Sequence, residues 1–207
     1  MSEILPDGRR LVLASTSPFR RELLARLGLP FTVQAPDVDE SRQPGEDAPT
    51  LVARLAESKA QAVARHDASA LIIGSDQAAV LDDEIIGKPG HHERAVAQLQ
   101  RASGRTVIFY TGLCLLDRAR HQHQVAVETF RVILRSLTPA TIENYLQREQ
   151  PYHCAGSFKS EGLGIALFER LEGDDPSSLI GLPLIRLTRM LEIACLLYTS
   201  RFRSARH

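Results

Sequence analysis

Short apolar runs alternate along the chain with segments in which apolar residues recur every three or four positions. The runs Leu11–Ser15 and Phe31–Ala35, together with Leu-Ile-Ile at 71–73, are typical of strands. The segments Pro18–Leu27 and Thr50–His66 have helical spacing instead. The first third of the chain therefore predicts alternating strands and helices. In the second helix the expected core-facing side chains are Leu51, Leu55, Ala62 and Val63.

The rest of the chain adds strands that are spaced for hairpins. The predicted strands after 71–73 are 78–81, 84–87, Thr106–Asp117, Val125–Leu134 and 165–173. The predicted helices are His92–Arg101, Ala140–Arg148 with Thr138 as its N-cap, and Pro183–Leu197. We expect the strand at 71–73 to stop at Gly74, and Asp82-Asp83 to turn one strand of a hairpin back onto the other.

Strands and helices that alternate, with hairpins between them, indicate an α/β fold with a mixed sheet and flanking helices. No internal repeat and no long linker is visible, so residues 1–197 are expected to form a single domain. The final segment, Tyr198–His207, is basic and lacks apolar periodicity. This tail is expected to be frayed or disordered.

Composition and charge exclude several classes of function. The 207 residues are 43% hydrophobic, which is enough for one sizeable core or two lobes. The net charge of +0 and the absence of Trp argue against a nucleic-acid-binding protein. The 3 cysteines are far apart, which argues against a disulfide framework or a zinc ribbon. The polar start and the lack of a long apolar run predict a cytoplasmic protein with no membrane segment.

The first candidate for chemistry is the junction between the first predicted strand and helix. Ser17 and Pro18 make a good helix start, and Ser15, Arg20 and Arg21 surround the free N–H groups of the first turn. Arginines in that turn are unfavourable for the helix dipole unless an anion is bound. The pattern fits a phosphate or carboxylate site, and it fits equally an ordinary capped helix whose arginines reach solvent.

Three further polar residues are candidates, each with a structural alternative. Asp76 follows the apolar run 71–73 and is expected at the carboxyl edge of the sheet, where ligands bind in open α/β folds. There it can bind a divalent cation or orient a water, or it can simply occupy a turn. Lys88 can bind a phosphate or be a solvated loop lysine. Lys59 lies on a predicted helix, where a lysine usually faces solvent.

Two loops are also candidates. The acidic loop at 35–49 contains Asp37, Asp39 and Glu40, which can supply a metal ligand or form a solvated loop. The Gly- and Ser-rich loop at 156–162 either surrounds a ligand or turns the chain. Walker A, dinucleotide-binding and nucleophile-elbow signatures are absent, and the histidine pairs lack the spacing of a zinc site.

Seven segments, met in order along the chain, carry a family resemblance. They are LASTSPFRRELLARLGLPF, APDVDE, RLAESKAQAVA, IIGSDQ, IIGKP, ASGRTVIFYTG and HCAGSFKSEGLGIALFERLEGDDPSSLIGLP. From about Leu11 to about Leu191 the chain resembles the Maf family of nucleotide pyrophosphatases. The resemblance implies a fold similar to that of the inosine triphosphate pyrophosphatases, with two lobes around a cleft. It also implies hydrolysis of a nucleoside triphosphate to the monophosphate and pyrophosphate, a Mg²⁺ or Mn²⁺ ion, and often a homodimer.

The resemblance assigns roles to individual residues. Asp76 matches the family's proposed proton acceptor, and Asp76 and Glu40 are the expected metal ligands. The matching polar pocket positions are Ser15, Arg20, Arg21, Glu40, Lys59 and Lys88. The positions that separate the substrate branches of the family are Phe19, Gln77 and Glu161.

The three branch positions favour one substrate. In the branch that hydrolyses dTTP and UTP they are typically Arg, Thr and Gln, whereas Phe19, Gln77 and Glu161 resemble the branch that acts on 7-methyl-GTP. The 7-methylguanine ring is formally cationic, so the Glu161 carboxylate offsets its charge, and the Phe19 ring offers a cation–π contact worth about 0.5–2 kcal/mol. The alternatives are a dTTP/UTP pyrophosphatase and a non-catalytic regulator of septum formation.

Overall fold

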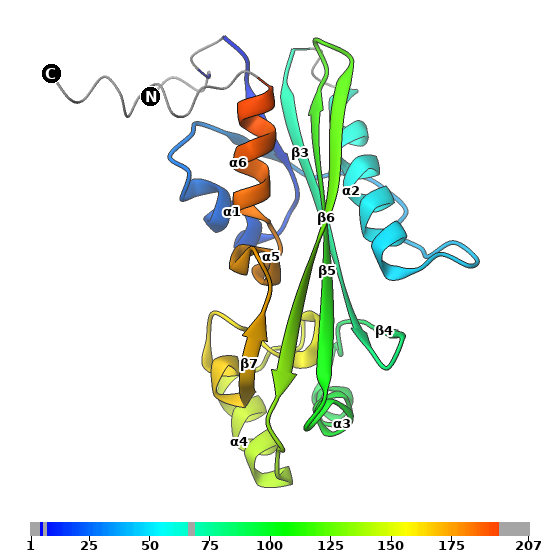
Figure 1. The fold of residues 1–207 in the computed structure, drawn as a ribbon, viewed down its shortest axis with the longest axis vertical. Coiled ribbons are helices and arrows are strands. Elements are labelled where there is room, and N and C mark those ends of the chain that lie inside the picture. Colours follow the sequence, from blue (N-terminus) through cyan, green and yellow to red (C-terminus); the bar gives the residue numbers. More distant parts are fainter. Residues whose placement is uncertain (1–4, 6–7, 66–68, 195–207) are drawn as a thin grey trace, which may run out of the picture.

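The computed structural model describes residues 5, 8–65 and 69–194. A seven-stranded mixed sheet runs the length of the molecule, in the order β2-β1-β3-β5-β6-β7, with β4 paired to β3 (Figure 1). The strands are β1 (Leu11–Ala14), β2 (Thr32–Gln34), β3 (Leu71–Leu81), β4 (Glu84–Ile86), β5 (Thr106–Asp117), β6 (Gln122–Leu134) and β7 (Phe168–Glu172). Strand β1 pairs in parallel with β2 and β3, and the other pairs are antiparallel. The predicted mixed sheet is confirmed.

Six α-helices and two 3-10 turns flank the sheet in the part of the chain that is described. They are α1 (Pro18–Ala25), α2 (Ala48–Ala64), α3 (His92–Ala102), α4 (Pro139–Glu149), α5 (Pro176–Ile180), α6 (Leu184–Ile193), η1 (Ala155–Ser157) and η2 (Leu163–Leu167). As predicted, Ser17 caps α1 and Thr138 caps α4, because each side-chain oxygen accepts an N–H of the first turn. The end of the last predicted helix at Leu197 and the tail 198–207 lie outside the described residues.

The helices gather at the two ends of the long strands, and each end has its own hydrophobic core (Figure 1). We call the end with α1, α2, α5 and α6 the upper lobe, and the end with α3 and α4 the lower lobe. The upper core includes Leu13, Ile73, Leu113 and Leu187, and the lower core includes Phe109, Phe130, Leu146 and Phe158. Since β3, β5 and β6 pass through both lobes, one sheet holds the two cores together. No helix among the described residues is long and apolar enough to cross a membrane.

Strand β3 corrects one prediction. The strand does not stop at Gly74, because β3 is a single strand from Leu71 to Leu81 that pairs along its length with β5. Its parallel neighbour β1 ends at Ala14, which lies beside Gly74 in the register. Asp76 therefore lies inside β3, just beyond the carboxyl end of β1, and not at the end of its own strand.

Two glycines explain why the chain runs straight on at this point. A Cβ atom on Gly74 would lie 2.0 Å from the carbonyl oxygen of Ala56, and one on Gly112 would lie 2.1 Å from the carbonyl oxygen of Val52. The missing side chains let helix α2 rest on the backbones of β3 and β5. Glycine here marks a close approach rather than a turn, and the approach places α2 next to Asp76.

Several other boundaries differ from the prediction by a few residues. Strand β6 begins at Gln122 and not at Val125, because its ladder with β5 continues through the polar residues 122–124. Residues 165–167 lie in η2, and the strand expected there begins at Phe168. Ala62 is only half-buried, whereas Lys59 lies on the buried stripe of α2. The short helix α5 was not predicted.

Candidate active site

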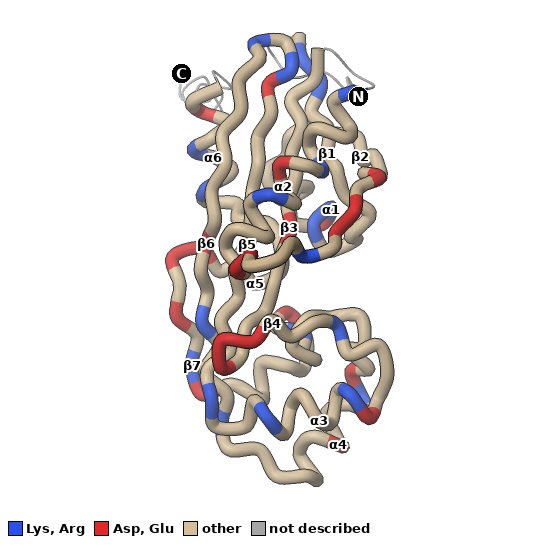
Figure 2. Tube along the Cα trace, turned by 90° about the vertical axis from the view of Figure 1, so that its right-hand side faces the viewer, with Lys and Arg blue, Asp and Glu red and all other residues tan. Residues whose placement is uncertain are grey.

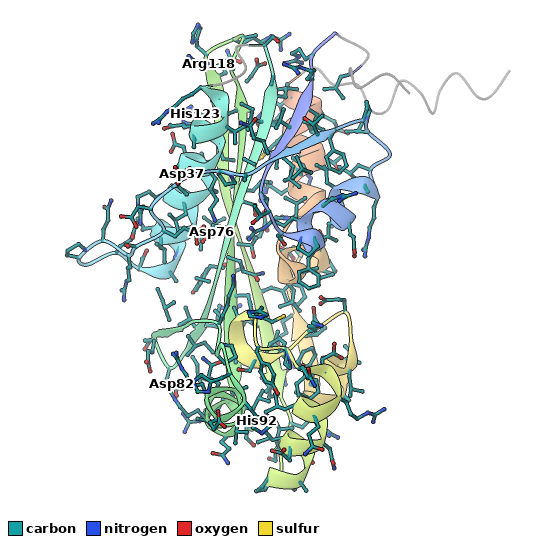
Figure 3. The ribbon with its side chains drawn as sticks, turned by 180° about the vertical axis from the view of Figure 1, so that it is seen from behind. Asp37, Asp76, Asp82, His92, Arg118 and His123 are labelled. Atoms are coloured by element: carbon teal, nitrogen blue, oxygen red, sulfur yellow. The ribbon has the colours of Figure 1, made fainter. Side chains whose placement is uncertain are left out.

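A cleft of about 870 Å³ lies between the two lobes and is lined by both. Figure 2 shows that the molecule narrows to a waist between the two lobes. Asp76 lies on β3, near the middle of the molecule (Figure 3). Nine of the residues predicted from the sequence line the cleft: Ser15, Phe19, Arg20, Glu40, Lys59, Asp76, Gln77, Lys88 and Glu161. Arg21 does not line it, and its side chain is exposed on α1. The substrate-binding role of Arg21 therefore has no support from its position.

The centre of the cleft is a buried lysine held between two carboxylates. Lys59 is 5% exposed, and its Nζ lies 2.6 Å from Asp76 Oδ1 and 2.6 Å from Glu40 Oε1. The three side chains come from helix α2, strand β3 and the loop after β2. Lys59 is on the apolar stripe of its helix because that stripe faces the strand that carries Asp76. Its charge is buried and paired, so it is a fixed part of the site rather than a solvated lysine.

Positive groups surround the two carboxylates. The hydrogen bond from Lys59 lowers the pKa of Glu40, and the nearby charges of Lys59, Lys88 and Arg20 lower it further. Burial lowers the pKa of the Arg20 guanidinium, while the charges of Asp76 and Glu40 act in the opposite direction. Three cations and two carboxylates are thus close enough to interact at one end of the cleft. Because its cations outnumber its carboxylates, such a cluster suits a polyanionic ligand.

The short helix α5, which the sequence did not predict, is followed by Gly181, whose carbonyl oxygen positions Arg20. Arg20 Nε donates to the carbonyl oxygen of Gly181 at 2.8 Å, and Ser75 Oγ donates to the same oxygen at 2.9 Å. Asp175 Oδ1 caps α5, and its Oδ2 accepts the backbone N–H of Ile185 at the start of α6. An available signal was Asp175 followed by proline, the pattern of a cap and a first helical residue.

The same helix fixes the orientation of the Gln77 amide. Gln77 Nε2 lies 2.8 Å from the carbonyl oxygen of Ser178, 3.0 Å from that of Leu179 and 3.1 Å from Thr111 Oγ1. The Thr111 hydroxyl itself donates to Ser178, so it can only accept from Gln77. All three neighbours are acceptors, which identifies the atom between them as the amide nitrogen. Because the donors of Gln77 are used in this way, its side chain offers the cleft an acceptor oxygen.

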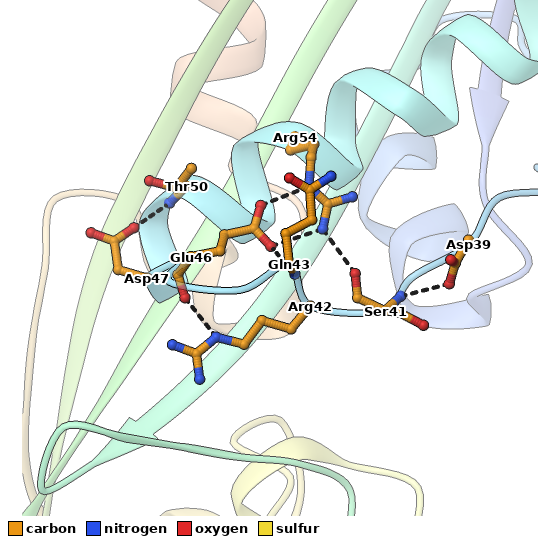
Figure 4. Close-up of polar contacts among 8 residues, drawn as sticks. All are labelled: Asp39, Ser41, Arg42, Gln43, Glu46, Asp47, Thr50 and Arg54. Atoms are coloured by element: carbon orange, nitrogen blue, oxygen red, sulfur yellow. Dashed lines mark hydrogen bonds and ion pairs between the residues drawn. The ribbon is translucent and has the colours of Figure 1, made fainter.

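A second ion pair holds the loop that carries Glu40. The carboxylate of Glu46 accepts two hydrogen bonds from Arg54 on α2, at 2.6 and 2.8 Å, and one from the backbone N–H of Gln43 at 3.0 Å (Figure 4). Arg54 Nη2 also donates to the carbonyl oxygen of Ser41 at 3.0 Å. The loop is therefore fastened to α2 immediately after Glu40. A bidentate pair of this kind restricts geometry as well as supplying energy.

The Glu46–Arg54 pair predicts a specific loss of stability in acid. The hydrogen bond from Arg54 lowers the pKa of Glu46 from 4.5 to about 2. The stabilisation from this ionised carboxylate is complete above pH 4.5 and is lost as the pH falls from 4.5 to about 2, where the unfolded chain binds more protons. We expect the free energy of unfolding, measured with urea across this range, to fall more steeply in the wild type than in Glu46→Gln. Equal pH slopes in the two proteins would contradict this prediction.

The carboxylates fit a divalent cation that is bound together with a substrate. Asp76 and Glu40 approach one cation, the Lys59 ammonium, and each uses a single oxygen for it. Mg²⁺ is commonly held by one or two carboxylates, with phosphate and water oxygens completing its shell. Within residues 8–65 and 69–194 no group of three or more His, Cys, Asp or Glu side chains forms a metal site. The donor set thus fits an ion shared with a phosphate and not a closed protein site.

Of the two candidate loops, residues 158–161 line the cleft, whereas Asp37 and Asp39 of the acidic loop do not. The histidine pairs at 91–92 and 121/123 also lie outside it. Asp37 is exposed, and Asp39 accepts a hydrogen bond from the backbone of Ser41. His92 in the lower lobe contacts Tyr152 and Glu143, whereas His123 is at the far end of the upper lobe (Figure 3). These residues have structural contacts or face solvent.

Comparison with known families decides how the cleft is to be interpreted. The model of the family described as Maf-like protein matches residues 10–194, which is most of the chain and includes every residue of the cleft. The chain belongs to the Maf family. The expected resemblance is thereby confirmed, and the mixed sheet of this Maf chain agrees with the fold that the resemblance implied.

Curated relatives of this Maf chain carry a more specific name. A 7-methyl-GTP pyrophosphatase of Nitrosococcus oceani is 62% identical over 91% of this chain and 95% of its own length. Proteins of the same name from Vibrio cholerae serotype O1 and a Polaromonas species are 58% and 54% identical, over 88% and 92% of this chain. They match 94% and 87% of their own lengths. The similarity therefore extends over both lobes.

Proposed function

We propose that this protein is a nucleoside triphosphate pyrophosphatase that hydrolyses 7-methyl-GTP to 7-methyl-GMP and pyrophosphate. The observation that carries the proposal is the similarity to three proteins named 7-methyl-GTP pyrophosphatase, at 54–62% identity along nearly the whole chain. Such an enzyme would act in the cytoplasm and remove modified nucleotides, a house-cleaning role. The family resemblance also implies a homodimer, and analytical ultracentrifugation of the purified protein tests that state directly.

The charges of the cleft support the reaction. Arg20, Lys59 and Lys88 supply positive charge for the triphosphate, and Ser15 also lines the cleft. Asp76 orients a water and accepts its proton as the water oxygen bonds to the α-phosphorus. The bond from that phosphorus to the bridging oxygen then breaks, and pyrophosphate leaves. Positioning and charge stabilisation account for most of the rate in such a reaction.

We propose that Asp76 and Glu40 also hold a Mg²⁺ or Mn²⁺ ion. When bound, this ion neutralises phosphate charge and makes the phosphorus easier to attack. Lys59 pairs with both carboxylates and keeps them at one place in the cleft. The protein thus contributes ordered oxygen ligands and a cation that limits their repulsion.

The base is recognised, in our proposal, by Phe19, Gln77 and Glu161. All three line the cleft, and they come from both of its sides. The acceptor oxygen of Gln77 suits the N–H groups on the edge of guanine, and the Glu161 carboxylate offsets the positive charge of the methylated ring. Phe19 is half-buried and adds an aromatic face.

Release of pyrophosphate from a panel of nucleotides tests the proposed function. With Mg²⁺ or Mn²⁺ present, we expect the highest kcat/KM for 7-methyl-GTP, and lower values for GTP, dTTP and UTP. Faster release from UTP or dTTP would instead identify the pyrimidine branch of the family. No release from any nucleotide would favour a non-catalytic regulator of septum formation.

A further inference from the structure

The loop that presents Glu161 to the cleft is held from outside the cleft. Glu161 is exposed, and its carboxylate is 3.3 Å from the hydroxyl of the adjacent Ser160. Among the described residues, no more distant side chain holds this carboxylate by a hydrogen bond or an ion pair. The place of its charge therefore depends on how firmly the backbone at 159–163 is fixed.

Glu149, at the end of α4, binds this loop on both sides of Glu161. Its Oε2 accepts the backbone N–H of Leu163 at 2.8 Å, and its Oε1 lies 3.2 Å from Lys159 Nζ. The two partners are two residues before and two residues after Glu161. The Glu149 side chain is 17% exposed, so the ion pair is partly shielded from solvent.

A glycine allows this carboxylate to lie against the loop backbone. A Cβ atom on Gly162 would come within 2.8 Å of Glu149 Oε2 and 2.9 Å of Oε1. One helical turn earlier on α4, the buried Tyr145 accepts the backbone N–H of Lys159 through its hydroxyl, at 3.1 Å. Helix α4 therefore fastens the start of the loop through Tyr145 and its end through Glu149.

We propose that Glu149 is a positioning residue that sets the selectivity of the enzyme for the cationic base by fixing the Glu161 carboxylate. This inference rests on the proposed function. Glu149 does not itself line the cleft, and it forms no hydrogen bond or ion pair with Glu40, Lys59 or Asp76. Its loss should therefore affect recognition of the charged ring and leave the chemistry at the phosphates in place.

The test compares 7-methyl-GTP with GTP, which has the same base without the methyl group and its positive charge. We expect Glu149→Ala to lower the ratio of kcat/KM for 7-methyl-GTP over GTP about tenfold, mainly through KM, because a small displacement of a binding group is costly. Glu149→Gln still accepts the Leu163 N–H and should recover most of the ratio. Glu143→Ala removes a carboxylate from the same helix away from the loop, and should leave the ratio unchanged.

A double variant separates positioning from general structural support. If Glu149 acts through Glu161, then adding Glu149→Ala to Glu161→Gln should lower the ratio no further than Glu161→Gln alone. Additive losses in the double variant, or equal losses with both nucleotides in Glu149→Ala, would overturn the inference and leave the proposed function intact. A wild-type enzyme that does not prefer 7-methyl-GTP would instead overturn the proposed function, and the inference with it.

Discussion

Asp76→Asn is expected to lower kcat for 7-methyl-GTP by about three orders of magnitude while the protein stays folded. An amide cannot accept the proton of the attacking water, and loss of a positioned base typically costs about 10²–10⁴-fold. The amide has the size of the carboxylate, and Lys59 keeps its partner Glu40 at 2.6 Å. The buried ammonium therefore does not lose all of its compensation, and the fold should persist.

Steady-state kinetics together with thermal unfolding of the variant measure both parts of this expectation. Asp37→Asn is the matched control, because Asp37 is exposed on the neighbouring loop and does not line the cleft. That control should retain the wild-type kcat. Turnover of Asp76→Asn within a few-fold of the wild type would remove Asp76 from the proposed mechanism.

Gly74→Ala is expected to cause a large loss of stability. The new methyl group would lie 2.0 Å from the carbonyl oxygen of Ala56 and 2.9 Å from the backbone nitrogen of Ala60. Both atoms belong to the backbone of α2, so no side chain can rotate away. Overpacking of this kind costs about 1–3 kcal/mol and occasionally more. We expect a loss at the upper end of that range, with α2 displaced from β3.

Urea unfolding measures this loss as a lower midpoint. Gly87→Ala is the control, because a Cβ atom on Gly87 meets nothing within 4 Å and its backbone is not in the left-handed region. That variant should unfold close to the wild-type midpoint. Since α2 carries Lys59, Gly74→Ala should also weaken the Lys59–Asp76 pair and lower kcat. A wild-type midpoint in Gly74→Ala would contradict close packing of α2 on β3 at this position.

Local sequence patterns predicted most of the strands and helices of this fold. Helical spacing, capping residues and the Asp82-Asp83 turn placed most strands and helices within a few residues, because these signals act between neighbours along the chain. Two failures of prediction also have physical reasons. Gly74 looked like a strand end because glycine usually marks a turn, whereas its reason here is a helix packed on the strand. Helix α5 is too short to show a period.

The candidate site was predictable in its residue types but not in its arrangement. Lys59 looked like an ordinary surface lysine of a helix, and only the packing of α2 on β3 buries it against Asp76. Arg20 and Arg21 looked equivalent, yet one is held by Gly181 at the cleft and the other faces solvent. A rotation of about 100° between successive helical residues separates them.

The sequence by itself determined most of the elements, the mixed α/β class and the set of polar residues that marks a Maf protein, since each depends on residues close together in the chain or on a matching motif. The tertiary structure alone decided which of those residues meet. Glu40, Lys59 and Asp76 come from a loop, a helix and a strand, and they converge because two glycines remove the side chains that would keep α2 away from the sheet. Likewise, Glu149 and Gly162 gain their importance only when α4 packs on the loop that carries Glu161. Charges interact through space rather than along the chain, so the chemistry of this cleft depends on long-range packing.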